Sequence, residues 1–292
     1  MAIALTAFTA ILISSFWLYK GFKIAFDLLD TKDADLSSKL KEFVFHRRRS
    51  KEELPLLVAL GGGTGLSSLL KGLKEVDVKL TAVVTVTDDG GSSGRLRKDL
   101  QILPPGDIRN CIVALSRSES LLSRLFQYRF TEGGEIEGHS LGNLFIAAMT
   151  GVVGDFTSAV REVSNILAIK GSVVPVTSDN VQLKAVFEDG SEMVGETAIC
   201  EVKKRIAKMS LLPESPAPNQ EALSAIDDAN MIVLGPGSLY TSVIPNLLID
   251  DIAKAVSKAR AHKAYICNVM TQPGETDGYG AYEHVRALLD HV

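Results

Sequence analysis

The sequence predicts an α/β fold, in which a mostly parallel sheet is covered by helices on both faces and carries a small antiparallel insert. The first observation is a strand–helix–strand alternation, formed by the apolar run Leu56–Leu60, a helical pattern over Leu66–Leu73 and a second apolar run at Ala82–Val86. A helix between two such runs is typical of a βαβ unit with parallel strands. The second observation is that short apolar runs repeatedly end in loops rich in Gly, Ser, Thr, Asp or Asn.

The middle of the chain changes pattern at about residues 171–199. Two short strand patterns, Val181–Phe187 and Met193–Ile199, flank Asp189-Gly190, a dipeptide typical of a hairpin turn. This arrangement predicts the antiparallel insert. Met231–Leu234 then returns the chain to the parallel sheet, because it is again a short apolar run.

The amino-terminal segment differs from the rest of the chain. No charged residue occurs from Met1 to Tyr19, and this length is near the lower limit for a membrane-spanning helix. We therefore expect one N-terminal transmembrane helix that anchors the protein at residues 1–20. A signal peptide, an interfacial helix and an ordinary buried helix are the alternatives.

Basic residues follow the apolar segment, at Lys20, Lys23 and Arg47–Arg49. Positive charge on this side favours a cytoplasmic main domain, tethered to the inner face of the cell membrane. The expected organisation is a juxtamembrane linker over 21–54 and an α/β domain over 55–292.

Composition limits the classes of function. The chain has 292 residues, 46% of them hydrophobic and 23% charged, which is ordinary for a packed globular protein. The formal net charge of -4 gives no broad basic field, so nucleic-acid binding is not expected. The three cysteines form no C-x-x-C pair, which argues against a zinc site or a disulfide framework.

Five loops are expected to form one ligand site. Loops at the carboxyl ends of parallel strands converge on one crevice, and glycine-rich loops there offer N–H donors to phosphate. The five segments are Gly61–Gly65, Thr87–Gly94, Gly138–Asn143, Gly235–Ser238 and Thr271–Gly274.

The first of these loops follows a strand and opens a helix, which is the context of a phosphate-binding turn. Its candidate contacts are Gly62, Gly63, Thr64 and Gly65. The loop is neither a P-loop, since no Lys follows the last glycine, nor the full dinucleotide fingerprint, since Leu66 stands where a third spaced glycine is expected. A tight turn without a ligand is the structural alternative.

The second loop begins with two carboxylates, Asp88 and Asp89. One of them is expected to hold a ribose hydroxyl, and Asp88 is also a candidate ligand for magnesium. Only one of the pair is expected in the site, because successive residues of an extended segment point to opposite sides. Ser92, Ser93 and Arg95 follow as candidate phosphate contacts, with a mobile lid or a structural turn as alternatives.

The third loop carries His139 and Asn143. His139 is interpreted as a ligand contact, with an acid or base role less favoured, and Asn143 as the residue that opens the helical pattern Leu144–Met149. No residue is predicted to be catalytic, because no general base accompanies an oriented nucleophile in any recognisable motif.

The remaining contacts come from the carboxyl-terminal third. Gly235, Gly237 and Ser238 offer donors, while the ring of Tyr240 could stack on a base or pack in the core. The amide of Asn268 could read the edge of a base or cap a turn.

The ordered loops resemble the YvcK-type gluconeogenesis factors, relatives of the 2-phospho-L-lactate transferase (CofD) family. The resemblance runs from about Leu56 to the end and includes Pro104–Asn110 and Asn268–Tyr279 besides the loops above. It implies a Rossmann-like fold and phosphate contacts at Gly63, Thr64, Gly65, Gly237 and Ser238. It also implies an acid contact at Asp88 or Asp89, and base and sugar contacts at Asn143, Tyr240 and Asn268. The chain differs from the family pattern in two respects. Its apolar amino-terminal segment is not part of the core pattern, and family members usually continue for some tens of residues beyond the position equivalent to Val292.

The resemblance also implies a function. It suggests a regulatory protein that binds a UDP-sugar such as UDP-N-acetylglucosamine and is needed for carbon metabolism, cell wall synthesis and cell shape. The alternative is a magnesium-dependent transferase that uses a nucleotide-diphosphate donor, like 2-phospho-L-lactate transferase. The expected partners are the nucleotide diphosphate ligand and the membrane, and homo-oligomerisation stays open.

Overall fold

The structure is a computed structural model that describes residues 54–116 and 121–291. The predicted anchor over 1–20 and the predicted linker over 21–54, apart from Leu54, lie outside the described residues. The residues Pro55–Val292 form one compact unit.

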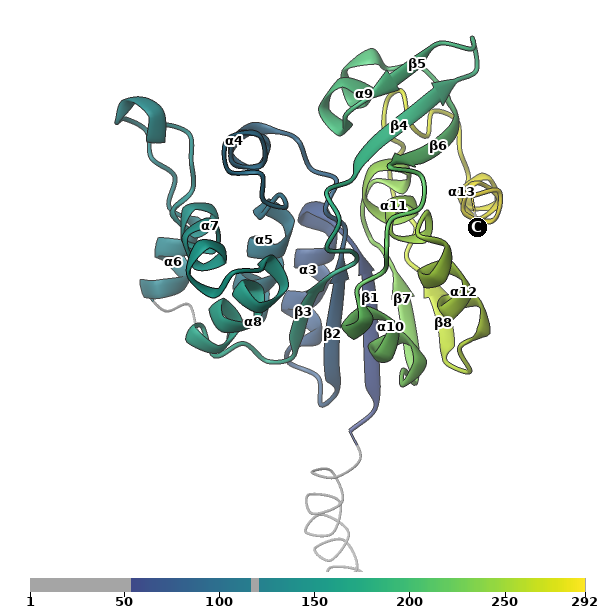
Figure 1. The fold of residues 1–292 in the computed structure, drawn as a ribbon. Helices are drawn as coiled ribbons and strands as arrows, with labels where there is room; N and C mark the ends of the chain where they lie inside the picture. The colour runs from purple at the N-terminus through teal and green to yellow at the C-terminus, as the bar shows by residue number, and fades with distance from the viewer. Residues whose placement is uncertain (1–53, 117–120, 292) are drawn as a thin grey trace, which may run out of the picture. The chain divides into compact units, whose positions relative to one another are not determined.

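A five-stranded parallel sheet forms the centre of this unit, in the order β3-β2-β1-β7-β8 (Figure 1). Its strands are β1 (Leu56–Gly61), β2 (Lys79–Val84), β3 (Ser172–Pro175), β7 (Met231–Leu234) and β8 (His262–Tyr265). On one side of β1 lie β2 and then β3, and on its other side lie β7 and then β8. The strand order therefore reverses between β1 and β7, and such a switch point is where open α/β sheets bind ligands. The expected parallel α/β fold is confirmed.

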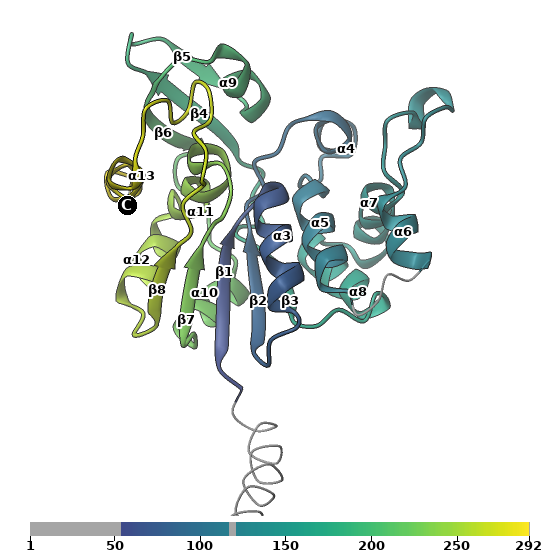
Figure 2. The same cartoon turned by 180° about the vertical axis from the view of Figure 1, so that it is seen from behind.

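Helices cover both faces of the sheet. The helices α3 and α5 lie on one face, and α10, α11 and α12 lie on the other (Figures 1 and 2). The helices are α3 (Gly63–Leu73), α4 (Gly91–Leu100), α5 (Gly106–Leu115), α6 (Leu121–Gln127), α7 (Leu141–Val153), α8 (Phe156–Ile166), α9 (Glu196–Val202), α10 (Gln220–Asp227), α11 (Ile244–Leu247), α12 (Asp250–Lys258) and α13 (Ala281–Leu289). A 3-10 turn, η1 (Gly134–Ile136), and a π-helical turn, η2 (Leu239–Val243), complete the list.

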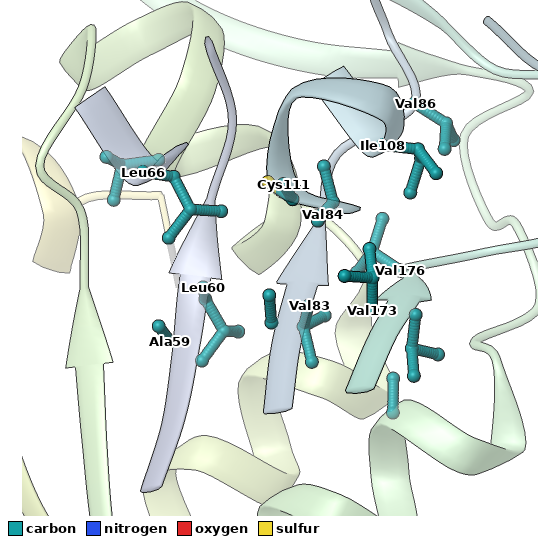
Figure 3. Packing of buried hydrophobic residues seen from close by; sticks show 14 of the residues in the cluster. Ala59, Leu60, Leu66, Val83, Val84, Val86, Ile108, Cys111, Val173 and Val176 are labelled. Atoms are coloured by element: carbon teal, nitrogen blue, oxygen red, sulfur yellow. The ribbon is translucent and has the colours of Figure 1, made fainter. Parts of the chain in front are cut away.

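The core lies between the sheet and its helices. Ala59 and Leu60 of β1 and Val83 of β2 are 0% exposed, as are Leu66 of α3 and Ile108 of α5 (Figure 3). A strand that is covered on both faces needs apolar side chains at successive positions rather than alternating ones. This requirement explains why the strands appear in the sequence as continuous apolar runs.

A three-stranded antiparallel sheet, in the order β5-β4-β6, lies beyond the carboxyl ends of the parallel strands (Figure 1). Its strands are β4 (Gln182–Phe187), β5 (Glu192–Val194) and β6 (Ile206–Leu212). Asp189-Gly190 forms the predicted turn, with Gly190 at φ +80°. The expected insert over 171–199 is thus displaced, because β3 pairs with β2 in the parallel sheet and the antiparallel sheet continues to Leu212.

Several element boundaries differ from those expected. The helix expected from Leu66 begins at Gly63, so the glycine-rich turn is itself the first turn of α3. The strand expected over Met193–Ile199 ends at Val194, and α9 follows after Gly195, which has φ +100°. Glycine favours this left-handed conformation, in which a strand does not continue.

Among the helices of the described residues, none alone has the length and apolar character to cross a bilayer. The pair α7 and α8 reaches that threshold when taken together, on length and composition, with a bend of 119° between its members.

Candidate ligand-binding site

Two loops meet at the switch point of the sheet: residues 61–65 after β1 and residues 235–238 after β7, together called the switch-point loops. A Cβ atom added to Gly65 would lie 2.5 Å from the carbonyl oxygen of Pro236. A Cβ atom on Gly61 would lie 3.8 Å from the Cα atom of Gly235. The loops therefore contact each other backbone to backbone, and at Gly65 the distance is one that only a residue without a side chain permits.

The start of α3 supplies backbone donors to this junction. Gly62 is extended and precedes the helix, while Gly63 has φ +62°. The first N–H groups of a helix have no intrahelical acceptor and lie at the positive end of the helix dipole. The amides of Gly63, Thr64 and Gly65 therefore suit a phosphate, as the sequence predicts.

Asp107 already uses one of these amides. The N–H of Gly63 donates to Oδ2 of Asp107 at 2.7 Å. Asp107 lies in the first turn of α5, which begins at Gly106. Burial raises the pKa of Asp107 to about 6, with the nearby charge of Asp88 adding to the rise.

The carboxylates of Asp88 and Asp89 have different surroundings. Oδ1 of Asp88 accepts from the N–H of Gly90 at 2.9 Å, and its Oδ2 lies 2.9 Å from where a Cβ atom on Gly106 would be. Oδ1 of Asp89 accepts from the N–H of Thr197 at 2.9 Å and from its hydroxyl at 2.6 Å. Asp88 thus lies beside Asp107, whereas Asp89 binds the start of α9 in the antiparallel insert.

Glu196 is a further acid that sequence reasoning missed. Thr87 donates its hydroxyl proton to Oε2 of Glu196 at 3.1 Å. Burial raises the pKa of Glu196 well above its ordinary value, and the charges of Asp107 and Asp88 raise it further. No local pattern could have indicated this, because Glu196 is more than one hundred residues from Thr87 along the chain.

Magnesium binding depends on how many ligands these acids can supply. Within residues 54–116 and 121–291, no group of three or more His, Cys, Asp or Glu side chains is placed to hold a metal ion. A magnesium ion held by one carboxylate would therefore need ligand phosphates to complete its shell. Asp88 stays a prediction in that role.

A buried polar cluster joins the start of α4 to the start of α7. The Ser92 hydroxyl lies 2.9 Å from Nδ1 of His139 and accepts from the side-chain amide of Asn143 at 3.0 Å. Burial lowers the pKa of His139, and the positive charge of Arg95 lowers it further, so the ring is neutral at pH 7. Serine and histidine are residue types that can act as a nucleophile and its general base. Ser92 and His139 are only 4% and 6% exposed, however, so both side chains are enclosed by protein.

Neighbouring residues stabilise this arrangement. The N–H of Gly106 donates to the Ser93 hydroxyl at 3.1 Å. Arg95 donates to the carbonyl oxygen of Glu137 at 2.5 Å, and so binds the segment around η1. Arg109 donates to the hydroxyl of Ser140, the residue that caps α7 through the N–H of Asn143. Ser93 and Arg95 therefore connect loops of the protein in this structure.

The loop after β8 contacts the loop after β7. The side-chain amide of Asn268 donates to the carbonyl oxygen of Gly237 at 2.9 Å, and that of Gln272 donates to the Ser238 hydroxyl at 2.7 Å. Tyr240 is 2% exposed, and its hydroxyl lies 2.9 Å from the hydroxyl of Tyr279. Asn268 is therefore adjacent to the switch-point loops, while the ring of Tyr240 is packed in the protein interior.

The structure thus brings the predicted residues to one end of the parallel sheet. The junction of the switch-point loops contains Gly62, Gly63, Thr64, Gly65, Gly235, Gly237 and Ser238, and Asp88 and Asn268 lie next to it. The cluster at the start of α4 contains Ser92, His139 and Asn143. Asp89 contacts the insert. Fold and loops together define an α/β protein whose glycine-rich turns meet at a sheet switch point.

Comparison with known proteins identifies the family. The family model described as 2-phospho-L-lactate transferase CofD matches residues 57–292, and the chain belongs to this family. Proteins named gluconeogenesis factor are similar to it: the one from Bacillus subtilis is 54% identical over 82% of this chain and 75% of its own length. The one from Halalkalibacterium halodurans is 53% identical over 80% of this chain and 73% of its own length. The predicted resemblance is confirmed.

A solved structure supports the fold. A crystal structure of a protein from Bacillus halodurans matches with a TM-score of 0.80 and 52% identity, over 82% of this chain and 77% of that one. A relative from Nostoc is 51% identical over 83% of this chain, which spans 53% of that relative's length. The similarity therefore covers nearly the whole described unit, but only part of the longer relatives.

Proposed function

We propose that this chain binds the diphosphate of a UDP-sugar, such as UDP-N-acetylglucosamine, at the switch-point loops. We propose further that it acts as a regulator needed for carbon metabolism, cell wall synthesis and cell shape. The observation that carries the binding proposal is the backbone contact between residues 61–65 and 235–238 at the start of α3. Such a junction favours an extended anion, because helix N-termini and glycine turns present several amides at once.

The names of the relatives support the regulatory part. Proteins about half identical to this chain are named gluconeogenesis factor, a name that describes a role in carbon metabolism rather than a reaction. Asn143 supplies further support for a ligand with hydroxyl or amide donors. Its Oδ1 atom is buried and has no hydrogen-bond partner among the residues described.

Calorimetry with the full-length chain tests the binding proposal. UDP-N-acetylglucosamine, UDP and uridine are titrated in turn. The UDP-sugar is expected to bind more tightly than uridine, because uridine lacks the diphosphate. GDP serves as the matched control for base preference. A folded protein that binds no UDP-sugar would contradict the proposal.

The second candidate is a magnesium-dependent transferase that uses a nucleotide-diphosphate donor. It is favoured by the position of Asp88, next to Asp107 and close to the switch-point loops. A carboxylate there can share a magnesium ion with ligand phosphates. Labelled UDP- and GDP-linked donors, incubated with and without magnesium, test this candidate, and an absence of product in both conditions counts against it.

The position in the cell is a separate proposal. We propose that residues 1–20 tether the α/β domain to the inner face of the cell membrane, since this segment is apolar and the following residues are basic. Fractionation of cells that express the whole chain tests this. The protein should resist carbonate extraction from membranes, and its recovery in the soluble fraction would contradict the tether.

A further inference from the structure

We propose that Asp107 is an internal competitor of the ligand: its carboxylate occupies the Gly63 amide that a phosphate would otherwise use, and it must be displaced on binding. This inference rests on the proposed function and adds to it the residue that limits affinity. The contact itself is the short hydrogen bond from the Gly63 N–H to Oδ2 of Asp107. A carboxylate oxygen and a phosphate oxygen are equivalent acceptors for such an amide.

The protein is shaped to hold the carboxylate at this point. A Cβ atom on Gly62 would lie 2.8 Å from Oδ2 of Asp107 and 2.6 Å from a methyl carbon of Thr85. Glycine at position 62 therefore leaves the space that the Asp107 side chain fills. The Asp107 side chain extends from the first turn of α5 to the N–H of Gly63, so it links the start of α5 to the start of α3.

The charged groups around Asp107 determine how much free energy is needed to displace its carboxylate from the Gly63 amide. The carboxylates that face it are those of Asp88, from the loop after β2, and Glu196, from α9. The cation that faces it is Arg109, whose guanidinium is already bonded to Ser140 and Asn110. A phosphate that binds the Gly63 amide leaves Asp107 beside the like charge of Asp88 and adds a further negative charge, so binding is weaker than the amides alone would allow.

A purely structural role for Asp107 predicts the opposite result. If the side chain served only to order the glycine loop for the ligand, its removal would loosen the loop and weaken binding. If it competes with the ligand, removal of its charge strengthens binding. Asp107→Asn separates the two roles, because asparagine keeps the shape and can still accept from Gly63 while the negative charge is lost.

The experiment is calorimetry without divalent cations, on the full-length wild-type chain, Asp107→Asn and Asp107→Ala. We expect Asp107→Asn to lower the Kd for UDP and UDP-N-acetylglucosamine by about tenfold and to leave uridine binding unchanged. Asp107→Ala should shift the Kd in the same direction. The matched control is Asp227→Asn on α10, which removes the same charge from an exposed position and should change nothing. Thermal melts establish that each variant is folded.

The outcomes are distinguishable. A wild-type protein that binds UDP, with weaker or equal binding by folded Asp107→Asn, overturns the inference and leaves the proposed function intact. Tighter phosphate binding with uridine unaffected supports the inference, as does binding by Asp107→Asn alone. Absence of binding by every folded variant overturns both.

Discussion

Glycine serves two different purposes in the switch-point loops and in the hairpin of the antiparallel sheet. At Gly190 the backbone has φ +80°, and a Cβ atom added there would meet nothing within 4 Å. At Gly65 the conformation suits any residue, but a Cβ atom would meet the backbone of Pro236. Gly190 is needed for the conformation of its own turn, whereas Gly65 is needed so that two distant segments can touch. The candidate site uses both properties, because Gly63 has φ +62°.

The largest expected effect is that of Gly65→Ala. The added methyl group should force the two switch-point loops apart, lower the free energy of unfolding by about 2 to 3 kcal/mol and abolish binding of UDP-sugars. Denaturant unfolding and calorimetry measure the two losses. The control is Gly72→Ala in the same helix, where nothing lies within 4 Å and a gain of about 0.5 to 1 kcal/mol is expected. Equal behaviour of the two variants would refute the close approach.

The second-largest expected effect concerns the pKa of two carboxylates, that of Asp107 near the switch-point loops and that of Asp189 in the hairpin. Burial raises the pKa of Asp107 to about 6, whereas the exposed Asp189 of the hairpin has its pKa lowered by hydrogen bonds from Lys204 and Ser191. A raised pKa means that Asp107 favours folding below pH 4 and loses this contribution as the pH rises through about 6. Asp107→Asn should therefore stabilise the protein by about 1 to 2 kcal/mol at pH 8 and by much less at pH 4. Asp189→Asn should not show a gain at pH 8. Unfolding curves across this pH range provide the measurement.

A smaller effect is expected at the hairpin. Gly190→Ala keeps the surrounding space free but places a side chain at positive φ, which costs about 1 kcal/mol. Calorimetry should show that affinity for the ligand is unchanged, because the turn contacts no switch-point residue. Loss of binding in this variant would show that the two regions are coupled.

The smallest effect is expected for Tyr240→Phe. The change removes the hydrogen bond to Tyr279 and keeps the buried ring, so the free energy of unfolding should fall by about 1 kcal/mol. Ligand affinity should change little if the ring only packs in the core. A large rise in Kd, measured by calorimetry, would instead show that the hydroxyl contacts the ligand.

Much of the fold is predictable because its signals are local. The strand Met231–Leu234 is found as expected, and β1 differs from the expected run only by Gly61, since a strand buried on both faces is a continuous apolar run. The hairpin at Asp189-Gly190 is equally local. Helices that begin in glycine-rich turns are harder to predict. Gly63-Thr64-Gly65 has low helix propensity, yet it forms the first turn of α3.

The site is less predictable because its contacts join distant segments. The sequence pattern places the glycine loops at the ends of strands, but it does not show that Asp107 contacts Gly63 or that Asp89 binds Thr197. These pairs are 44 and 108 residues apart. The sequence predicts that only one of Asp88 and Asp89 lies in the site, and the tertiary contacts direct the two carboxylates to different neighbours.

The position of β1 in the middle of the sheet has a consequence for synthesis of the protein. Its loop is made early, while its partner at residues 235–238 is translated more than 150 residues later. A nascent chain on the ribosome can therefore display the α3 amides well before the segment that completes their surroundings exists. A ligand that needs both switch-point loops can therefore bind only after residues 235–238 have been translated.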